Sequence, residues 1–402
     1  MKNKKKIVHL AKGLDGGAGI ATKRIHLFLK KNNYESIIIK QDNISASKFK
    51  KIKNFLKSCK IFYNFYLRVN KYCFSFLYQK KNKKLIDEVF KINKIKKIDC
   101  IFIHWIDGFV SSEDLIILKK NLDAEFYLVL HDMYHLTGGC HYSYECKNYK
   151  LNCKNCPGVP IFLENKVNTN YISKLNAYKI INPKLLVFSK NDYLLSKKSK
   201  LNFKNIFYLN YPLDLNIFNY QGNKALKKNY QILTSVIKYD PRKGYYIFKK
   251  FLEILELHLR KINIKIDIFV YDKKLFKQKY KNINFIYFKF KKNDKELSNL
   301  YKKLDLYINF SNADAAPLSI VENLHCGVPI VSANIGNSRD HINDYKNGII
   351  IDKYDAELFV KILIKILLKK IKFYNKKKIS RIQKNSLIKE NRKFLKVLND
   401  KF

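Results

Sequence analysis

Residues 311–336 read SNADAAPLSIVENLHCGVPIVSANIG, and a short apolar run at residues 306–310 comes directly before them. The apolar run and residues 329–333 each have the length and composition of a buried strand, and a helix is predicted to open at Pro317 between them. A strand, a helix and a second strand in this order form the repeating unit of a parallel α/β sheet. This stretch therefore predicts an α/β fold with parallel strands.

Two carboxylates lie in the same stretch. Asp314 comes just past the end of the first predicted strand, and Glu322 follows eight residues later inside the helix. Unpaired backbone N–H groups at the start of a helix can hold a phosphate, and carboxylates can bind sugar hydroxyls. The stretch therefore predicts an anion pocket at the end of a parallel sheet, of a kind that suits a nucleotide sugar.

Short apolar strands alternate with longer helical patterns along the whole chain. Helical spacing is found at residues 20–31, 245–257 and 356–370, among others. The predicted strands are 7–10, 36–39, 100–104, 126–131, 184–189, 232–237, 264–270, 283–287, 306–310 and 329–333. Ten strands fit two doubly wound sheets better than one. A chain of 402 residues is also longer than a domain with a single hydrophobic core usually is.

The break between the two sheets is predicted near residues 210–230, where turn residues occur without a sustained period. The predicted domains are an α/β domain at 1–210, a second α/β domain at 211–375, and a basic helical tail at 376–402. Two open α/β domains that face each other bind ligands in a cleft between the carboxyl ends of their strands.

The chain is strongly basic, with 80 Lys and Arg against 33 Asp and Glu and a net charge of +47. Because lysine is spread along the whole chain, we interpret the excess mainly as a compositional bias that also favours attraction to anionic membranes or nucleic acid. We expect no export signal, because the apolar run at residues 7–10 is too short for one, and no stretch reaches the roughly 18 apolar residues of a membrane span. The sequence therefore predicts a cytoplasmic protein whose eight cysteines are reduced.

Four of these cysteines, Cys140, Cys146, Cys153 and Cys156, lie within 17 residues of one another. Four thiolates are enough for a closed, structural zinc site, although only the last pair has the common CxxC spacing. Structural zinc and simple reduced thiols are the two leading interpretations, and disulfides come third.

Two loops at strand ends hold candidate ligand-binding residues. Gly16, Gly17 and Gly19 lie between a strand and a helix, and their spacing is not the dinucleotide-binding GxGxxG. They predict either a close approach of the backbone to a ligand or a tight turn. Arg242 and Lys243 come just before a helix, where a cation pair can neutralise a diphosphate leaving group.

Two histidines end neighbouring predicted strands. His131 is predicted to face the cleft between the domains, whereas His104 with Trp105 is interpreted mainly as packing. Residues 49–78 place aromatic and apolar residues at helical spacing among lysines. A helix packed on its own sheet is the preferred interpretation, and an amphipathic helix on an anionic bilayer is the alternative. No nucleic-acid-binding signature accompanies these aromatics.

The motifs together resemble the retaining glycosyltransferases of family 4, which have the GT-B fold of two facing Rossmann-like domains. Residues 130–160, LHDMYHLTGGCHYSYECKNYKLNCKNCPGVP, are similar to one subgroup often encoded in capsule, O-antigen (lipopolysaccharide) or exopolysaccharide gene clusters. The segments DGGAGIA, IHWIDGF and DPRKG match the same subgroup. The resemblance implies an acceptor-side first domain, a nucleotide-sugar-binding second domain and catalysis without a divalent metal.

Each acidic residue of the family's motif is matched by an acidic residue of this sequence. Glu322 matches the family's acid at the nucleotide ribose. Asp314 matches the acid at the transferred sugar, where the family has a glutamate that is one methylene longer. Pro317 stiffens the loop where the family has glycine, while Leu318 and Ser319 still offer backbone N–H groups to the diphosphate.

The basic residues of the family's phosphate-binding site are matched less completely by this sequence. Lys243 matches the family's phosphate-binding lysine, and the charge of the family's upstream arginine would come from Lys238 or Arg242. His131 matches the cleft histidine near the donor sugar, and the Gly16–Gly17 pair matches the loop under the diphosphate or the acceptor.

The sequence thus predicts a glycosyltransferase on the inner face of the cell membrane. It would move a sugar from an NDP-sugar to a lipid-linked or growing glycan acceptor with retention of configuration, with no specific nucleic-acid partner. The alternative is a catalytically silent GT-B-fold scaffold or polyanion-binding protein, because Asp314 and the missing arginine depart from the family pattern.

Overall fold

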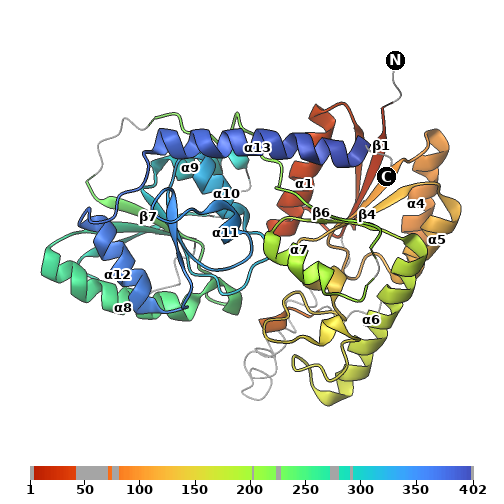
Figure 1. Ribbon diagram of the computed structural model, residues 1–402, viewed down its shortest axis with the longest axis horizontal. Coiled ribbons are helices and arrows are strands. Elements are labelled where there is room, and N and C mark those ends of the chain that lie inside the picture. Colours follow the sequence, from red (N-terminus) through yellow and green to blue (C-terminus); the bar gives the residue numbers. More distant parts are fainter. Residues whose placement is uncertain are drawn as a thin grey trace. The chain divides into compact units, whose positions relative to one another are not determined.

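The computed structural model describes residues 4–41, 71–74, 81–201, 203–222, 228–271, 280–289 and 293–399. The chain divides into two compact units, Met1–Pro212 and Leu213–Phe402. Each unit is a parallel sheet with helices on its faces (Figure 1). Of the aromatic stripe predicted at 49–78, only residues 71–74 lie within the described residues, so the membrane-helix alternative stays a prediction.

The first unit is built on a six-stranded parallel sheet in the order β2-β1-β3-β4-β5-β6. Its strands are β1 (Lys6–Ala11), β2 (Glu35–Lys40), β3 (Cys100–Ile103), β4 (Glu125–Val129), β5 (Lys184–Val187) and β6 (Ile206–Tyr208). The inner strands β1, β3 and β5 are buried along their whole length, as expected for apolar strands that helices cover on both faces.

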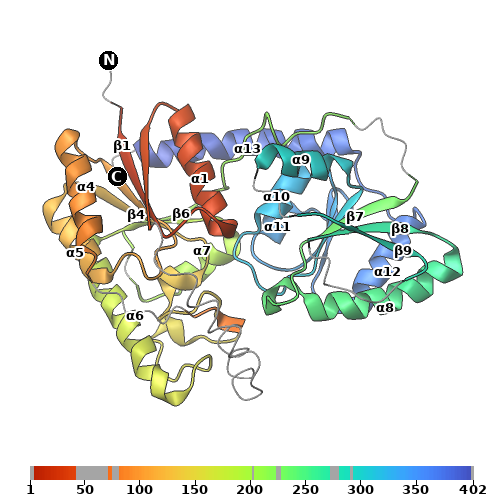
Figure 2. The ribbon, with the colours of Figure 1, turned by 180° about the vertical axis from the view of Figure 1, so that it is seen from behind.

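Helices cover both faces of this first sheet (Figure 2). They are α1 (Gly16–Lys31), α4 (Lys83–Ile95), α5 (Ser112–Asn121), α6 (Ile161–Ile181) and α7 (Lys190–Lys197), with short 3-10 turns η1 (Met133–Leu136) and η2 (Asn148–Lys150). Leu85 of α4, Leu115 of α5 and Tyr178 of α6 join one apolar core with Leu10 of β1. Helix α1 packs on the opposite face (Figure 2).

The second unit is also a six-stranded parallel sheet, in the order β12-β11-β10-β7-β8-β9. Its strands are β7 (Tyr230–Thr234), β8 (Ile266–Val270), β9 (Ile283–Tyr287), β10 (Leu306–Asn309), β11 (Ile330–Ala333) and β12 (Gly348–Ile351). Read from β9, this is the 3-2-1-4-5-6 order of doubly wound sheets, in which the chain reverses direction across the sheet between β7 and β10.

Two apolar cores lie on the two faces of the second sheet. The helices are α8 (Tyr245–Ile262), α9 (Asp294–Lys303), α10 (Leu318–His325), α11 (Ser338–His341), α12 (Ala356–Leu367) and α13 (Lys376–Asn399), with the 3-10 turn η3 (Pro241–Lys243). Helices α8 and α12 pack on one face, and α9, α10 and the start of α13 pack on the other (Figure 1). The Ser380 hydroxyl on α13 donates to the His325 carbonyl at 2.5 Å, which ties α13 to α10.

All ten predicted strands coincide with strands of the structure, but the described residues contain two more, β6 and β12. Both are edge strands, and the apolar run within each is only three residues long. In the part of the chain that the structure describes, every helix is too short or too polar to cross a membrane.

Candidate functional site

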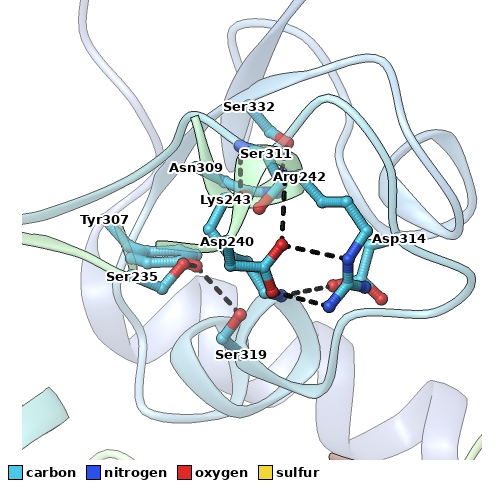
Figure 3. A network of polar contacts seen from close by, with 10 residues as sticks. All are labelled: Ser235, Asp240, Arg242, Lys243, Tyr307, Asn309, Ser311, Asp314, Ser319 and Ser332. Atoms are coloured by element: carbon cyan, nitrogen blue, oxygen red, sulfur yellow. Dashed lines mark hydrogen bonds and ion pairs between the residues drawn. The ribbon is translucent and has the colours of Figure 1, made fainter. Parts of the chain in front are cut away.

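The candidate site lies where the second sheet reverses its order, between β7 and β10. Doubly wound sheets bind their ligands at such a point, beyond the carboxyl ends of the strands. The loop after β7 carries Asp240, Arg242 and Lys243, and the loop after β10 carries Asp314 (Figure 3). The backbone N–H of Asn312 donates to the Arg242 carbonyl at 2.9 Å, so the two loops are held together.

A glycine brings these loops close together. Gly244 has φ +74°, and a Cβ atom at this position would lie 2.0 Å from the carbonyl oxygen of Phe310 at the end of β10. The tight packing explains why the segment ends in glycine, because any other side chain would push the β10 loop away from Lys243.

We expect Gly244→Ala to lower the free energy of unfolding by about 2–4 kcal/mol, since the clash with Phe310 adds to the strain of a positive φ. Gly222→Ala is the matched control: its φ is +84°, and a Cβ there would meet no atom of the described residues within 4 Å. Urea unfolding of both variants measures the difference, and equal losses would contradict the role of the clash.

Lys243 and Asp314 form the central ion pair of the site. Lys243 Nζ donates to Asp314 Oδ2 at 2.8 Å, and the two side chains are only 22% and 16% exposed. Burial acts to lower the pKa of the Lys243 ammonium, but the charge and the hydrogen bond of Asp314 outweigh it and raise that pKa above its ordinary value. Lys243 was predicted to bind the diphosphate and Asp314 the transferred sugar, whereas in the structure the two side chains form an ion pair with each other.

The other two predicted cations have different partners. Arg242 donates from Nε and Nη2 to the two carboxylate oxygens of Asp240, at 3.1 and 2.6 Å, in a bidentate pair (Figure 3). The ammonium of Lys238 lies 5.7 and 6.0 Å from the ring centroids of Tyr239 and Tyr245. Lys243 is thus the cation that the structure places beside Asp314.

A tyrosine links the start of α10 to the sheet. Helix α10 begins at Leu318 after the N-cap residue Pro317. The hydroxyl of the next residue, Ser319, lies 2.9 Å from the Tyr307 hydroxyl on β10, which lies 2.8 Å from the Ser235 hydroxyl after β7 (Figure 3). The sequence analysis missed Tyr307 and Ser235. Tyr307 lies in β10, which reads LYIN, and nothing in the sequence indicates what its hydroxyl contacts.

Glu322 lies on the buried side of α10 and is 3% exposed. Its Oε2 accepts a hydrogen bond from the Tyr301 hydroxyl on α9 at 2.7 Å. Burial raises the pKa of Tyr301 well above its ordinary value, and Glu322 adds to this rise. Burial also raises the pKa of Tyr271, with further contributions from Tyr307 and Glu322. The sequence analysis missed Tyr301, whose hydroxyl is the hydrogen-bond partner of Glu322.

Gly16 and Gly19, in the loop after β1, are explained by two different backbone requirements. Gly16 starts α1 with φ +71°. At Gly19 a Cβ atom would lie 2.2 Å from the backbone carbon of Leu14, so this glycine is required by the turn itself. Around Gly17 the described residues leave more room, with no atom within 4 Å of an added Cβ. The ligand contact predicted for Gly16 and Gly17 stays a prediction.

His131 follows β4 and is half-buried. Its Nε2 lies 2.9 Å from His104 Nδ1, and its Nδ1 lies 2.8 Å from the Tyr211 hydroxyl, so both ring nitrogens are hydrogen-bonded. Burial lowers the pKa of His131 to about 4, and the charge of Asp132 offsets part of that drop. The interpretation of His104 as mainly packing was incomplete, because both its ring nitrogens are hydrogen-bonded, to His131 and to His9.

The four clustered cysteines are free thiols. Cys140, Cys153 and Cys156 are buried, and Cys146 is half-buried. Burial raises the pKa of Cys140 and raises that of Cys153 to about 12, so both are protonated near pH 7. Within the described residues, no three or more His, Cys, Asp or Glu side chains are placed to hold a metal ion. The structural zinc site predicted for these cysteines stays a prediction.

Residues 216–387, most of the second unit, match the family model described as Glycosyl transferases group 1. The second unit is thus similar to the group 1 glycosyl transferases. This is the region that contains Lys243, Asp314, Glu322 and the start of α10. No curated protein matches the chain.

Solved structures resemble the chain over almost its whole length. Sucrose-phosphate synthase from Thermosynechococcus elongatus has a TM-score of 0.63 at 11% identity and covers 98% of each chain. Anabaena HepE in complex with UDP has a TM-score of 0.62 at 13% identity, covering 98% of this chain and 99% of its own. A glycosyltransferase from Rickettsia africae has a TM-score of 0.60 at 15% identity and covers 98% of each. The predicted GT-B fold is confirmed.

Proposed function

We propose that this protein is a glycosyltransferase that takes a sugar from a nucleoside diphosphate sugar. The observation that carries the proposal is the Lys243–Asp314 pair beside the α10 start, at the reversal point of the sheet in the region that matches the group 1 family model. The HepE structures hold UDP and UDP-glucose, which supports a nucleoside diphosphate donor for a chain of the same fold.

Charge stabilisation is the chemistry that this site offers. When the bond between the sugar and the diphosphate breaks, its electron pair stays on the diphosphate oxygen. Lys243 and the N–H groups at the start of α10 would stabilise this negative charge. A bound diphosphate would share Lys243 with Asp314, leaving the carboxylate beside the sugar hydroxyls. His131 would orient the sugar, and no divalent metal is required in this scheme.

The finer features rest on the resemblance to family 4. They are retention of configuration, a lipid-linked or growing glycan acceptor, and a role in capsule, O-antigen or exopolysaccharide synthesis. The net charge of +47 supports attachment to an anionic membrane surface, because each Lys or Arg near such a surface contributes about 1 kcal/mol.

The second candidate is a catalytically silent scaffold or polyanion-binding protein of the same fold. The observation that favours it is that carboxylates already neutralise both cations of the site, Arg242 through Asp240 and Lys243 through Asp314. Such a protein would bind sulfated polysaccharide in a salt-sensitive manner and would bind no nucleotide.

Titration calorimetry with UDP, GDP and their sugars distinguishes the two candidates. A glycosyltransferase is expected to bind one nucleotide with a Kd of about 1 µM to 1 mM and to hydrolyse its sugar slowly in a donor panel. Failure of every nucleotide to bind, together with binding of sulfated polysaccharide, would favour the scaffold.

A further inference from the structure

A continuous chain of hydrogen-bonded side chains crosses the first unit. Six residues form it, in the order His26, Ser36, His9, His104, His131 and Tyr211, and we call them the histidine chain. The five consecutive contacts join ring nitrogens and hydroxyl oxygens at 2.7, 2.9, 2.8, 2.9 and 2.8 Å. Each inner residue of the chain is hydrogen-bonded to the residue before it and to the residue after it, so the chain is continuous.

The order of the strands produces this arrangement. Ser36 lies on β2, His9 on β1, His104 directly after β3 and His131 two residues after β4. These strands are consecutive neighbours in the sheet, so each contributes one member of the chain. His9 and His104 are fully buried. The rings of His104 and His131 are nearly parallel, with an interplanar angle of 15°.

A neutral imidazole carries a hydrogen on one nitrogen and accepts with the other. The chain therefore has two complete hydrogen-bonding arrangements. In one, Tyr211 donates to His131 and every ring carries its hydrogen on Nε2. In the other, every ring carries it on Nδ1 and His131 donates to Tyr211. Neighbouring rings with different tautomers would place two hydrogens, or two bare nitrogens, against each other.

The surroundings keep the three inner rings neutral. Burial lowers the pKa of His9 to about 3, that of His131 to about 4 and that of His104 well below its ordinary value. The titratable neighbours are Lys30 beside His26, His135 beside His104 and Asp132 beside His131. A single tautomer shared by all rings is therefore the state expected near neutral pH.

We propose that Ser36, His9 and His104 are positioning residues that decide, through the histidine chain, which nitrogen of His131 carries the hydrogen. They thereby set whether Tyr211 donates to His131 or accepts from it. A switch between the two arrangements moves one proton in at one end, Tyr211 or His26, and one proton out at the other. The functional reading rests on the proposed glycosyl transfer. Both ring nitrogens of His131 are already used within the chain, so the polarity that it sets would reach a sugar hydroxyl through the Tyr211 hydroxyl.

Nitrogen NMR of histidine-labelled protein tests the tautomers directly, since the resonance of each ring nitrogen depends on whether it carries the hydrogen. His9, His104 and His131 are expected to share one tautomer. In Ser36→Ala, which removes the hydroxyl next to His9, the resonances of all three rings should shift together. Different tautomers in wild-type neighbours, or a response of His9 alone, would overturn the proposal.

The control variants separate this effect from a loss of packing. Ser36→Thr keeps the hydroxyl and is expected to restore the wild-type tautomer. Thr22→Val removes another buried hydroxyl of the same unit, one that donates to the Ala18 carbonyl at 2.9 Å outside the chain, and should leave all three rings unchanged. A shift of the rings in Thr22→Val equal to that in Ser36→Ala would count against the chain.

Kinetics give the functional test. Ser36→Ala is expected to lower the turnover of the donor sugar about tenfold with KM within about twofold, while Ser36→Thr and Thr22→Val stay within about twofold of wild type. An unchanged turnover in Ser36→Ala would overturn the positioning role. If wild-type protein turns over no donor, the proposed function fails, and the NMR result still decides whether the rings are coupled.

Discussion

Lys243→Met is expected to lower the turnover number about 100- to 1,000-fold, the largest effect of any single change at the site. Lys243 is the cation that lies beside Asp314, and removal of one preorganised charge-stabilising group costs about this much. The variant also leaves the mostly covered Asp314 carboxylate without its ion-pair partner, so the free energy of unfolding should fall by about 1–3 kcal/mol. Donor turnover and urea unfolding measure the two effects.

Two further variants make this expectation specific. Lys250→Met removes an exposed lysine from α8 and should change neither quantity, which excludes a general effect of lower net charge. Lys243→Met combined with Asp314→Asn should recover stability without recovering turnover, because the uncompensated carboxylate is gone but the cation is still missing. Near-normal turnover of Lys243→Met would remove the central residue of the proposed mechanism.

Glu322→Ala is expected to lower kcat/KM for the donor about 100-fold, and it should also destabilise the second unit. The resemblance places Glu322 at the nucleotide ribose, and a hydrogen bond to a charged group contributes about 1.5–3 kcal/mol to binding. The structure adds the second effect, because the buried Tyr301 hydroxyl would lose its 2.7 Å acceptor. The free energy of unfolding should fall by about 1–3 kcal/mol.

Glu322→Gln separates the two roles of this side chain. The amide keeps the volume and an oxygen that accepts from Tyr301, so stability should stay within about 1 kcal/mol of wild type while kcat/KM still falls. Tyr301→Phe in the Glu322→Ala background should recover stability without recovering activity, because no buried hydroxyl is then left unsatisfied. Full activity of Glu322→Gln would show that the charge of Glu322 has no part in binding the donor.

The strands were the most predictable part of the fold. Inner strands such as β3, which reads CIFI, are buried on both faces, so they appear in the sequence as uninterrupted apolar runs. Strands β6 and β12 were missed because the apolar run within each is only three residues long, although β12 is buried along its whole length. The order of the strands within each sheet was beyond the sequence patterns, which show where a strand lies but not which strand lies beside it.

The residues of the candidate site were predicted from the sequence, but the ion pairs that they form were not. Lys243 and Asp314 were both identified from their loops, 71 residues apart, yet their mutual ion pair depends on β7 and β10 being neighbours. The role of Arg242 was likewise altered by a contact within its own loop, the bidentate pair with Asp240. Tyr307 was missed because one tyrosine in an apolar strand does not reveal what its hydroxyl will meet.

The amino-acid sequence by itself determined the parallel α/β class, the acidic loop and the helix that opens at Leu318, because these depend on local periodicity and on the residues at strand ends. Only the tertiary structure decided which groups form hydrogen bonds or ion pairs with one another. His26, Ser36, His9, His104, His131 and Tyr211 come from six separate segments and form one chain of hydrogen bonds. The reason is physical: a hydrogen bond needs two atoms within about 3 Å, and for residues far apart in sequence only the packing of neighbouring strands brings them that close.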